Sequence, residues 1–205
     1  MQIDPRTRNI WFSSNSLSAY FSDYKKALSQ AMESISQAEM EKAHKIMVEV
    51  AGRGGTFYVA GNGGSAAIAD HLCCDWTKGT YGENLLPLRT VSLGANTALM
   101  TAVANDFGYD EIFSRSLKML AKPTDALFVI SSSGNSPNIV NALKMAQELG
   151  IPSIGLTGFT GGKAKDLATA KIHVEYSNYA IVEDCHQAAM QALAQYFFVA
   201  QSPQK

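Results

Sequence analysis

Five short runs rich in β-branched and aromatic residues, each followed by a helical pattern, constrain this chain more than any other feature. The runs are Thr56–Ala60, Arg89–Leu93, Ala126–Ile130, Pro152–Leu156 and Lys171–Glu175. Apolar residues at helical spacing predict helices over 65–77, 95–105, 110–119, 137–149, 162–168 and 181–200. This alternation predicts an α/β, doubly wound, mainly parallel five-stranded sheet with helices on both faces. Ligands of such sheets bind beyond the carboxyl ends of the strands, so candidate site residues are expected directly after each strand.

A helical leader over residues 14–52 precedes the first predicted strand. Its apolar residues, among them Leu17, Phe21 and Leu28, fall on one face of a helix. An apolar face needs a surface to cover, which is either the following sheet or a second subunit. We expect one domain over 1–205, in which this leader contributes to oligomerisation.

Composition narrows the class of partner. The chain has 205 residues, of which 46% are hydrophobic, and its formal net charge is -1. A near-neutral chain of this length can bury a core and does not favour nucleic acid or an anionic membrane as partner.

The three cysteines, with Cys73 and Cys74 adjacent, match neither a disulfide framework nor a zinc knuckle. No segment reaches the roughly 18 apolar residues that span a bilayer, and the start lacks the pattern of a secretory signal, so we expect a cytoplasmic protein.

The loop Gly61–Ser65, with the sequence GNGGS, follows the first predicted strand and leads into a helix. Glycines let the backbone approach an anion, the amides and dipole of a helix N-terminus attract negative charge, and the Ser65 hydroxyl adds a donor. The loop lacks the Gly-Lys-Ser/Thr end of a nucleotide P-loop and the Gly-x-Gly-x-x-Gly spacing of dinucleotide sites. Taken alone, it is either a phosphate site or an ordinary tight turn.

The loop Ser131–Ser136, with the sequence SSSGNS, follows the third predicted strand, and Pro137 suits the first turn of the next helix. Four serine hydroxyls and the side-chain amide of Asn135 converge there on one helix N-terminus. Hydroxyls and backbone amides can surround a phosphate dianion without any arginine. Together the two loops predict a phosphate site, provided that the sheet brings them side by side.

These loops, with Asn105-Asp106-Phe107-Gly108 and Leu156-Thr157-Gly158, resemble the sugar isomerase (SIS) domain of phosphoheptose isomerases, which act on sedoheptulose 7-phosphate. The resemblance covers most of the chain. It implies a homotetramer with a sugar phosphate bound between subunits, and aldose–ketose isomerisation at C1 and C2 with a divalent metal, usually zinc. The positions that match substrate contacts of the family are Asn62, Gly63, Gly64, Asn105, Asp106, Ser131, Ser132, Ser133 and Ser136. Ser65 and Asn135 are added as expected substrate contacts because of the hydroxyl and amide donors that they contribute to the loops.

Four positions match the metal ligands of the family, which are a histidine, a glutamate, a glutamine and a histidine. This chain places His71, Asp75, Glu183 and Gln191 there. Only the first histidine is unchanged. One imidazole and two carboxylates remain, which is enough for a three-ligand metal site. The resemblance therefore implies a divalent metal, with zinc as the expected ion.

The same departures alter the expected catalysis. Isomerisation needs a base that removes a proton beside the carbonyl, and an acid or metal that stabilises the enediolate. We expect Asp75 and Glu183 to share the acid–base work, and His186, which lies near Glu183 on the predicted helix, can assist it. Asp75 is one methylene shorter than glutamate, and a shift of about 1 Å can cost on the order of a hundredfold in rate. Gln191 cannot transfer a proton.

Two hypotheses follow. The first is an isomerase acting on sedoheptulose 7-phosphate or a similar ketose phosphate. The second is a non-catalytic SIS scaffold that binds a sugar phosphate or a protein, as does a relative associated with the bacterial replication initiator, and the absence of the last-helix histidine favours it. A sugar-phosphate-responsive regulator lacks support because the chain shows no DNA-binding module. Proton exchange beside the carbonyl of a ketose phosphate discriminates between the first two.

Overall fold

A computed structural model describes residues 12–201 of the chain. Its sheet has five parallel strands in the order β2-β1-β3-β4-β5, which confirms the predicted fold class. The strands are β1 (Thr56–Gly61), β2 (Arg89–Ser92), β3 (Ala126–Ser131), β4 (Ser153–Thr157) and β5 (Ala170–His173). Each predicted strand has at least one end that was wrong by one or two residues, because a strand ends where its ladder partners end and not where its composition changes.

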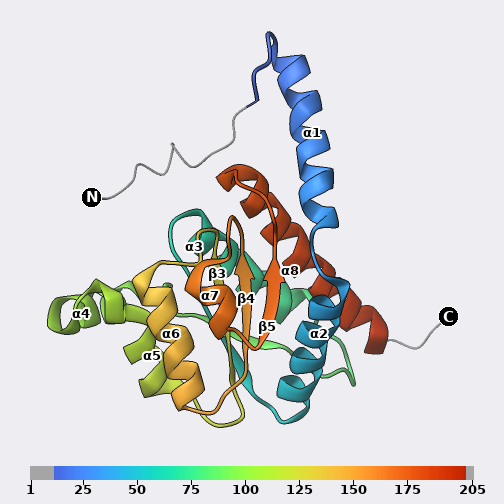
Figure 1. Ribbon diagram of the computed structural model, residues 1–205. Helices are drawn as coiled ribbons and strands as arrows, with labels where there is room; N and C mark the ends of the chain where they lie inside the picture. The colour runs from blue at the N-terminus through green and yellow to red at the C-terminus, as the bar shows by residue number, and fades with distance from the viewer. Residues whose placement is uncertain (1–11, 202–205) are drawn as a thin grey trace.

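Helices cover both faces of the sheet (Figure 1). One face carries α2 (Gln37–Gly52), α3 (Gly64–Cys74) and α8 (Tyr179–Gln201), and the other carries α5 (Ile112–Leu120), α6 (Pro137–Glu148) and α7 (Gly162–Leu167). Side chains of β1 alternate between the two cores: Phe57 and Val59 enter the first, and Tyr58 and Ala60 enter the second. Burial on both faces explains why these strands are continuous apolar runs.

Two helices lie at the margins of this body. In Figure 1, α4 (Thr97–Phe107) extends to one side and α1 (Leu17–Glu33) projects away from the sheet. Ala27 and Ala31 anchor the carboxyl half of α1 in a small apolar cluster with residues of α8, whereas Leu17 is 84% and Phe21 58% exposed. The leader therefore packs partly on its own domain, and its role in oligomerisation stays a prediction.

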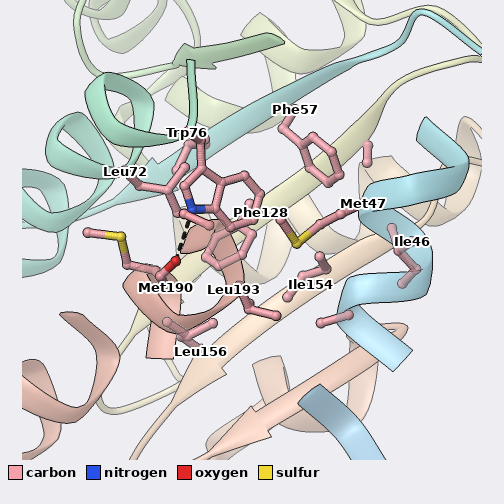
Figure 2. Close-up of a cluster of buried hydrophobic side chains, with 14 of the residues drawn as sticks. Ile46, Met47, Phe57, Leu72, Trp76, Phe128, Ile154, Leu156, Met190 and Leu193 are labelled. Carbon is pink, nitrogen blue, oxygen red and sulfur yellow. Dashed lines mark hydrogen bonds between the residues drawn. The ribbon is translucent and has the colours of Figure 1, made fainter. Parts of the chain in front are cut away.

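Trp76 joins α3 to α8 at the centre of the first core. The sequence predicted one helix over 65–77, but the α-helix ends at Cys74 and continues as the π-helical turn η2 (Asp75–Gly79). The Trp76 ring is fully buried, packs edge-on against Phe128 with centroids 5.2 Å apart, and donates from Nε1 to the Met190 carbonyl at 3.0 Å (Figure 2). This contact sets the register of the π-turn against α8.

One further prediction changes in detail. The helix predicted over 110–119 is divided into a 3-10 turn, η3 (Tyr109–Glu111), and α5. Across residues 12–201, no helix combines the length and apolarity needed to cross a bilayer.

Candidate functional site

The strand order brings the two predicted phosphate loops together. β1 pairs with β3, with Gly61 opposite Ile130, so the loops that follow these strands meet at one edge of the sheet. Asn62 at the tip of the first loop and Asn138 in α6 exchange two side-chain hydrogen bonds of 2.9 and 3.0 Å. The assumption on which the phosphate prediction depended is therefore confirmed.

A cavity of about 150 Å³ opens between these loops and the start of α8. It is lined by Asn62, Ser65, Ile130, Ser131, Ser132, Ser133, Ser136, Tyr179 and Glu183. The Ser132 hydroxyl is buried and has no hydrogen-bond partner among the described residues, and the Ser136 side chain makes no capping bond to α6. An unpaired buried hydroxyl is costly unless a ligand or water completes its bonding. Polar donors around one hollow at a helix N-terminus suit an anionic oxygen group.

The second loop is held rigid from behind. The Gly134 carbonyl accepts from Ala164 N at 2.9 Å, and Asn135 Oδ1 accepts from Lys163 N at 3.2 Å. A Cβ on Gly134 would lie 1.8 Å from the Gly161 carbonyl oxygen, so this approach of two backbones requires glycine. Asn135 does not line the cavity, and it shapes the loop that does.

Glu183 brings a carboxylate into the same cavity as the serines. It lies on α8 and reaches the N-terminus of α3, where a Cβ on Gly64 would come 2.5 Å from Glu183 Oε2. Burial, and to a smaller extent the neighbouring carboxylate of Asp184, raises the pKa of Glu183. A raised pKa brings a carboxylate nearer to the working range of a general base at neutral pH.

A second polar cluster lies further along the same pair of helices. His71 Nε2 is 2.9 Å from Asp75 Oδ2, and His71 Nδ1 is 2.6 Å from Gln187 Nε2. Asp75 Oδ2 also accepts from Gln191 Nε2. Asp75 and Gln191 line a neighbouring hollow of about 330 Å³ with the apolar side chains of Phe198 and Val199. The cluster therefore connects α3 and η2 with α8.

The four predicted metal ligands are divided by this arrangement. His71, Asp75 and Gln191 lie together, but Glu183 lies in the serine-lined cavity. In the part of the chain that the structure describes, no three His, Cys, Asp or Glu side chains are placed to hold one ion. Catalytic zinc sites draw three ligands from these residue types, so the donors that converge here do not fit a zinc ion.

Asn105 and Asp106 do not line the cavity that holds the serines. Both are exposed near the end of α4, where Asn105 Nδ2 donates to Asp106 Oδ1 at 2.9 Å. Their helix follows the edge strand β2, and two residues after its end the Tyr109 hydroxyl donates to Asn62 Oδ1 at 3.0 Å. Gly63 has a φ of +56° and lines a different hollow of about 230 Å³ beside Tyr109.

The sequence patterns did not indicate several residues that lie at the site. Tyr179 and Gln187 lie four positions before and after Glu183, so helical spacing was the signal that could have found them. Asn138 had no such signal, because its role depends on the contact with Asn62. His186 does not assist Glu183: its ring is fully buried beside Thr157 and His173 and makes no hydrogen bond to the carboxylate.

Comparisons with known proteins agree with this geometry. The SIS domain family profile matches residues 19–158. The chain is 41% identical over 150 residues to a phosphoheptose isomerase of Aliarcobacter butzleri, covering 73% of this chain and 79% of that protein. It is 38% identical over 169 residues to a probable phosphoheptose isomerase of Thermoplasma volcanium, covering 82% and 86%. The solved phosphoheptose isomerase of Francisella tularensis superposes with a TM-score of 0.81 at 29% identity, covering 89% of this chain and 96% of that one.

Proposed function

Because the chain belongs to the SIS domain family, we propose that it interconverts a ketose phosphate and an aldose phosphate through an enediolate, with sedoheptulose 7-phosphate or a similar sugar phosphate as substrate. The observation that carries this proposal is the Glu183 carboxylate, whose pKa is raised, in the same cavity as the serine hydroxyls. A carboxylate in that position supplies the base that an isomerase needs and that phosphate binding alone does not require. The relatives named as isomerases do not favour the scaffold alternative either.

The phosphate is proposed to bind at the N-terminus of α6. The Ser132 hydroxyl lacks a protein partner among the described residues and supplies one donor, and Ser136 supplies another. Ser131 and Ser133 accept backbone N–H groups within their own loop, at 3.2 and 3.3 Å, which orients the serines and the turn between them. Binding by neutral donors and a helix dipole holds a dianion without a fixed positive charge, which favours release of the product.

The proton transfers are proposed to belong to Glu183 and Asp75. In the ketose-to-aldose direction, a carboxylate removes a proton from C1, the electrons form the C1–C2 double bond and leave the charge on O2, the hydroxyl proton of O1 moves to O2, and a proton is returned to C2 as the C1 carbonyl forms. Glu183 lies beside the phosphate loops, and Asp75 lies on the turn that continues the helix beginning at Gly64.

A homotetramer with sites between subunits is part of the same proposal. Its support is that Asn105 and Asp106 match substrate positions of the family but are exposed on α4, away from the serine-lined cavity of their own chain. Leu17 and Phe21 on the projecting end of α1 offer apolar surface for a second copy. Light scattering coupled to gel filtration measures the assembly, and a monomer that isomerises at full rate would contradict this part. A cytoplasmic location also stays a prediction.

The test is a direct assay of the purified protein with sedoheptulose 7-phosphate, in which the aldose product is detected. Glu183→Gln and Asp75→Asn should each lower turnover while leaving the binding of inorganic phosphate unchanged. The matched control is Glu175→Gln, whose exposed carboxylate does not line the serine-lined cavity. Ser132→Ala should weaken phosphate binding, by about 1 kcal/mol or more for one lost hydrogen bond. Full turnover in both carboxylate variants would remove them from the mechanism.

A further inference from the structure

The hydrogen bonds around Asp75 occupy its Oδ2 atom and both ring nitrogens of His71. Asp75 and His71 come from η2 and α3, and Gln187 and Gln191 come from successive turns of α8. Both nitrogens of the His71 ring have partners, Asp75 at 2.9 Å and Gln187 at 2.6 Å. Asp75 Oδ2 receives the second glutamine amide as well.

The direction of each hydrogen bond follows from the donors available. A carboxylate only accepts, so the His71 Nε2 that faces Asp75 carries the proton. In the neutral ring, Nδ1 then holds the lone pair, and the Gln187 amide donates to it. A metal binds imidazole through that lone pair, so a metal on His71 would have to displace either the glutamine or the proton on Nε2.

The number of carboxylates in this cluster also disfavours a divalent cation. Asp75 is the single carboxylate in this cluster, and Glu183, the other carboxylate that the family resemblance places here, packs against Gly64 in the serine-lined cavity. One carboxylate and one imidazole offer a divalent cation less than the three ligands of a catalytic zinc site. Two glutamine amides, in contrast, match one carboxylate and one imidazole as hydrogen-bond partners.

We propose that this chain holds Asp75 and His71 in place by the amides of Gln187 and Gln191 and keeps its site without zinc. The inference rests on the proposed function for the role of Asp75, but the state of the cluster is independent of turnover. Gln191 orients Asp75 through its amide, which makes it a positioning residue. Its replacement by histidine should convert the cluster into a metal site, because a second imidazole would supply the missing ligand.

The experiment is zinc analysis of the full-length protein purified without chelator, beside the variants His71→Ala and Gln191→His. We expect wild type and His71→Ala to contain the same amount of zinc, below about 0.1 ion per chain after dialysis. Gln191→His should gain about one ion per chain and bind zinc at least about a hundredfold more tightly than wild type by calorimetry.

The opposite result is equally clear. About one zinc per chain in wild type that is absent from His71→Ala would overturn the proposal, as would removal of that zinc by a chelator with a fall in thermal stability. Gln191→Ala tests the positioning role of Gln191 separately from metal binding. If Asp75 loses its orientation, this variant should lower kcat more than it raises KM. Metal content is read without any substrate, so a protein that fails to isomerise leaves this test intact.

Discussion

Replacing Trp76 by phenylalanine tests the contact that aligns the π-turn with α8. The ring is fully buried and packs edge-on against Phe57 and Phe128 at centroid distances of 5.5 and 5.2 Å, while its N–H donates to the Met190 carbonyl (Figure 2). Phenylalanine keeps an aromatic ring there but loses the N–H and part of the ring volume. The lost hydrogen bond costs about 1 kcal/mol, and truncating Trp to Ala costs roughly 3–5 kcal/mol, so the intermediate change should cost roughly 2–3 kcal/mol.

Thermal and urea unfolding of Trp76→Phe measure this cost. For a chain of this length, each kcal/mol shifts Tm by roughly 2–4 °C, so we expect a fall of roughly 4 to 12 °C. The matched control is Tyr58→Phe in the other core, which removes one 3.0 Å hydrogen bond to the Leu120 carbonyl but no ring volume, and should cost about 1 kcal/mol.

The position of Trp76 makes a second prediction about the site. Trp76 directly follows Asp75, and Met190 directly precedes Gln191, so the indole bond aligns the pair that forms the Asp75–Gln191 contact. Trp76→Phe should therefore lower kcat on a ketose phosphate, whereas Tyr58→Phe should not. Equal stability of the two variants, or wild-type turnover in Trp76→Phe, would refute this reasoning.

Three further predictions concern the loops and the buried histidine. Gly64→Ala should push the Glu183 carboxylate aside and lower turnover on the order of a hundredfold with little change in stability. The control Gly52→Ala, whose Cβ would meet no atom within 4 Å, should leave turnover unchanged, and normal kinetics in Gly64→Ala would contradict the prediction. Gly134→Ala should lower the free energy of unfolding by about 3 kcal/mol or more, because the new Cβ collides with the Gly161 carbonyl. Gly150 has a similar φ of +68° but no atom within 4 Å of a new Cβ, so Gly150→Ala should lower the free energy of unfolding by only about 1–2 kcal/mol. Burial lowers the pKa of His186 to about 4, so the unfolded chain takes up a proton between pH 6.5 and 4 that the folded chain does not. Stability should fall by about 3 kcal/mol as pH drops through this window, and a urea series in which His186→Leu shows the same pH dependence as wild type would exclude the histidine as the cause.

The strand-helix alternation and the phosphate loops could be predicted because their signals are local. The run Ala126–Ile130 is apolar throughout, as a strand buried on both faces requires, and the structure places it at the centre of the sheet. Gly61–Ser65 and Ser131–Ser136 carry their chemistry within a few residues, so only the strand order was missing. The strand order depends on pairing between segments that are far apart in the sequence, such as β1 with β3, and no local pattern reveals it.

The positions of the site carboxylates could not be predicted because they depend on how two helices meet. Placing Glu183 with His71 required the register of α8 against α3, which contacts such as Trp76–Met190, 114 residues apart in sequence, determine. No local motif in the sequence marks the π-turn at Asp75, whose next residue, Trp76, makes this contact. Asn105 and Asp106 were assigned from matched positions, and the structure places both exposed on α4, outside the lining of the serine-lined cavity.

Solvent exchange is the measurement that tests the proposed isomerisation most directly. Sedoheptulose 7-phosphate incubated with wild-type protein in deuterium oxide should gain deuterium at C1, as followed by NMR, and should yield the aldose phosphate. Glu183→Gln or Asp75→Asn should slow this exchange while phosphate binding persists. Binding of the sugar phosphate without exchange at C1, for this and shorter ketose phosphates, would contradict the isomerase and leave a site that only holds its ligand.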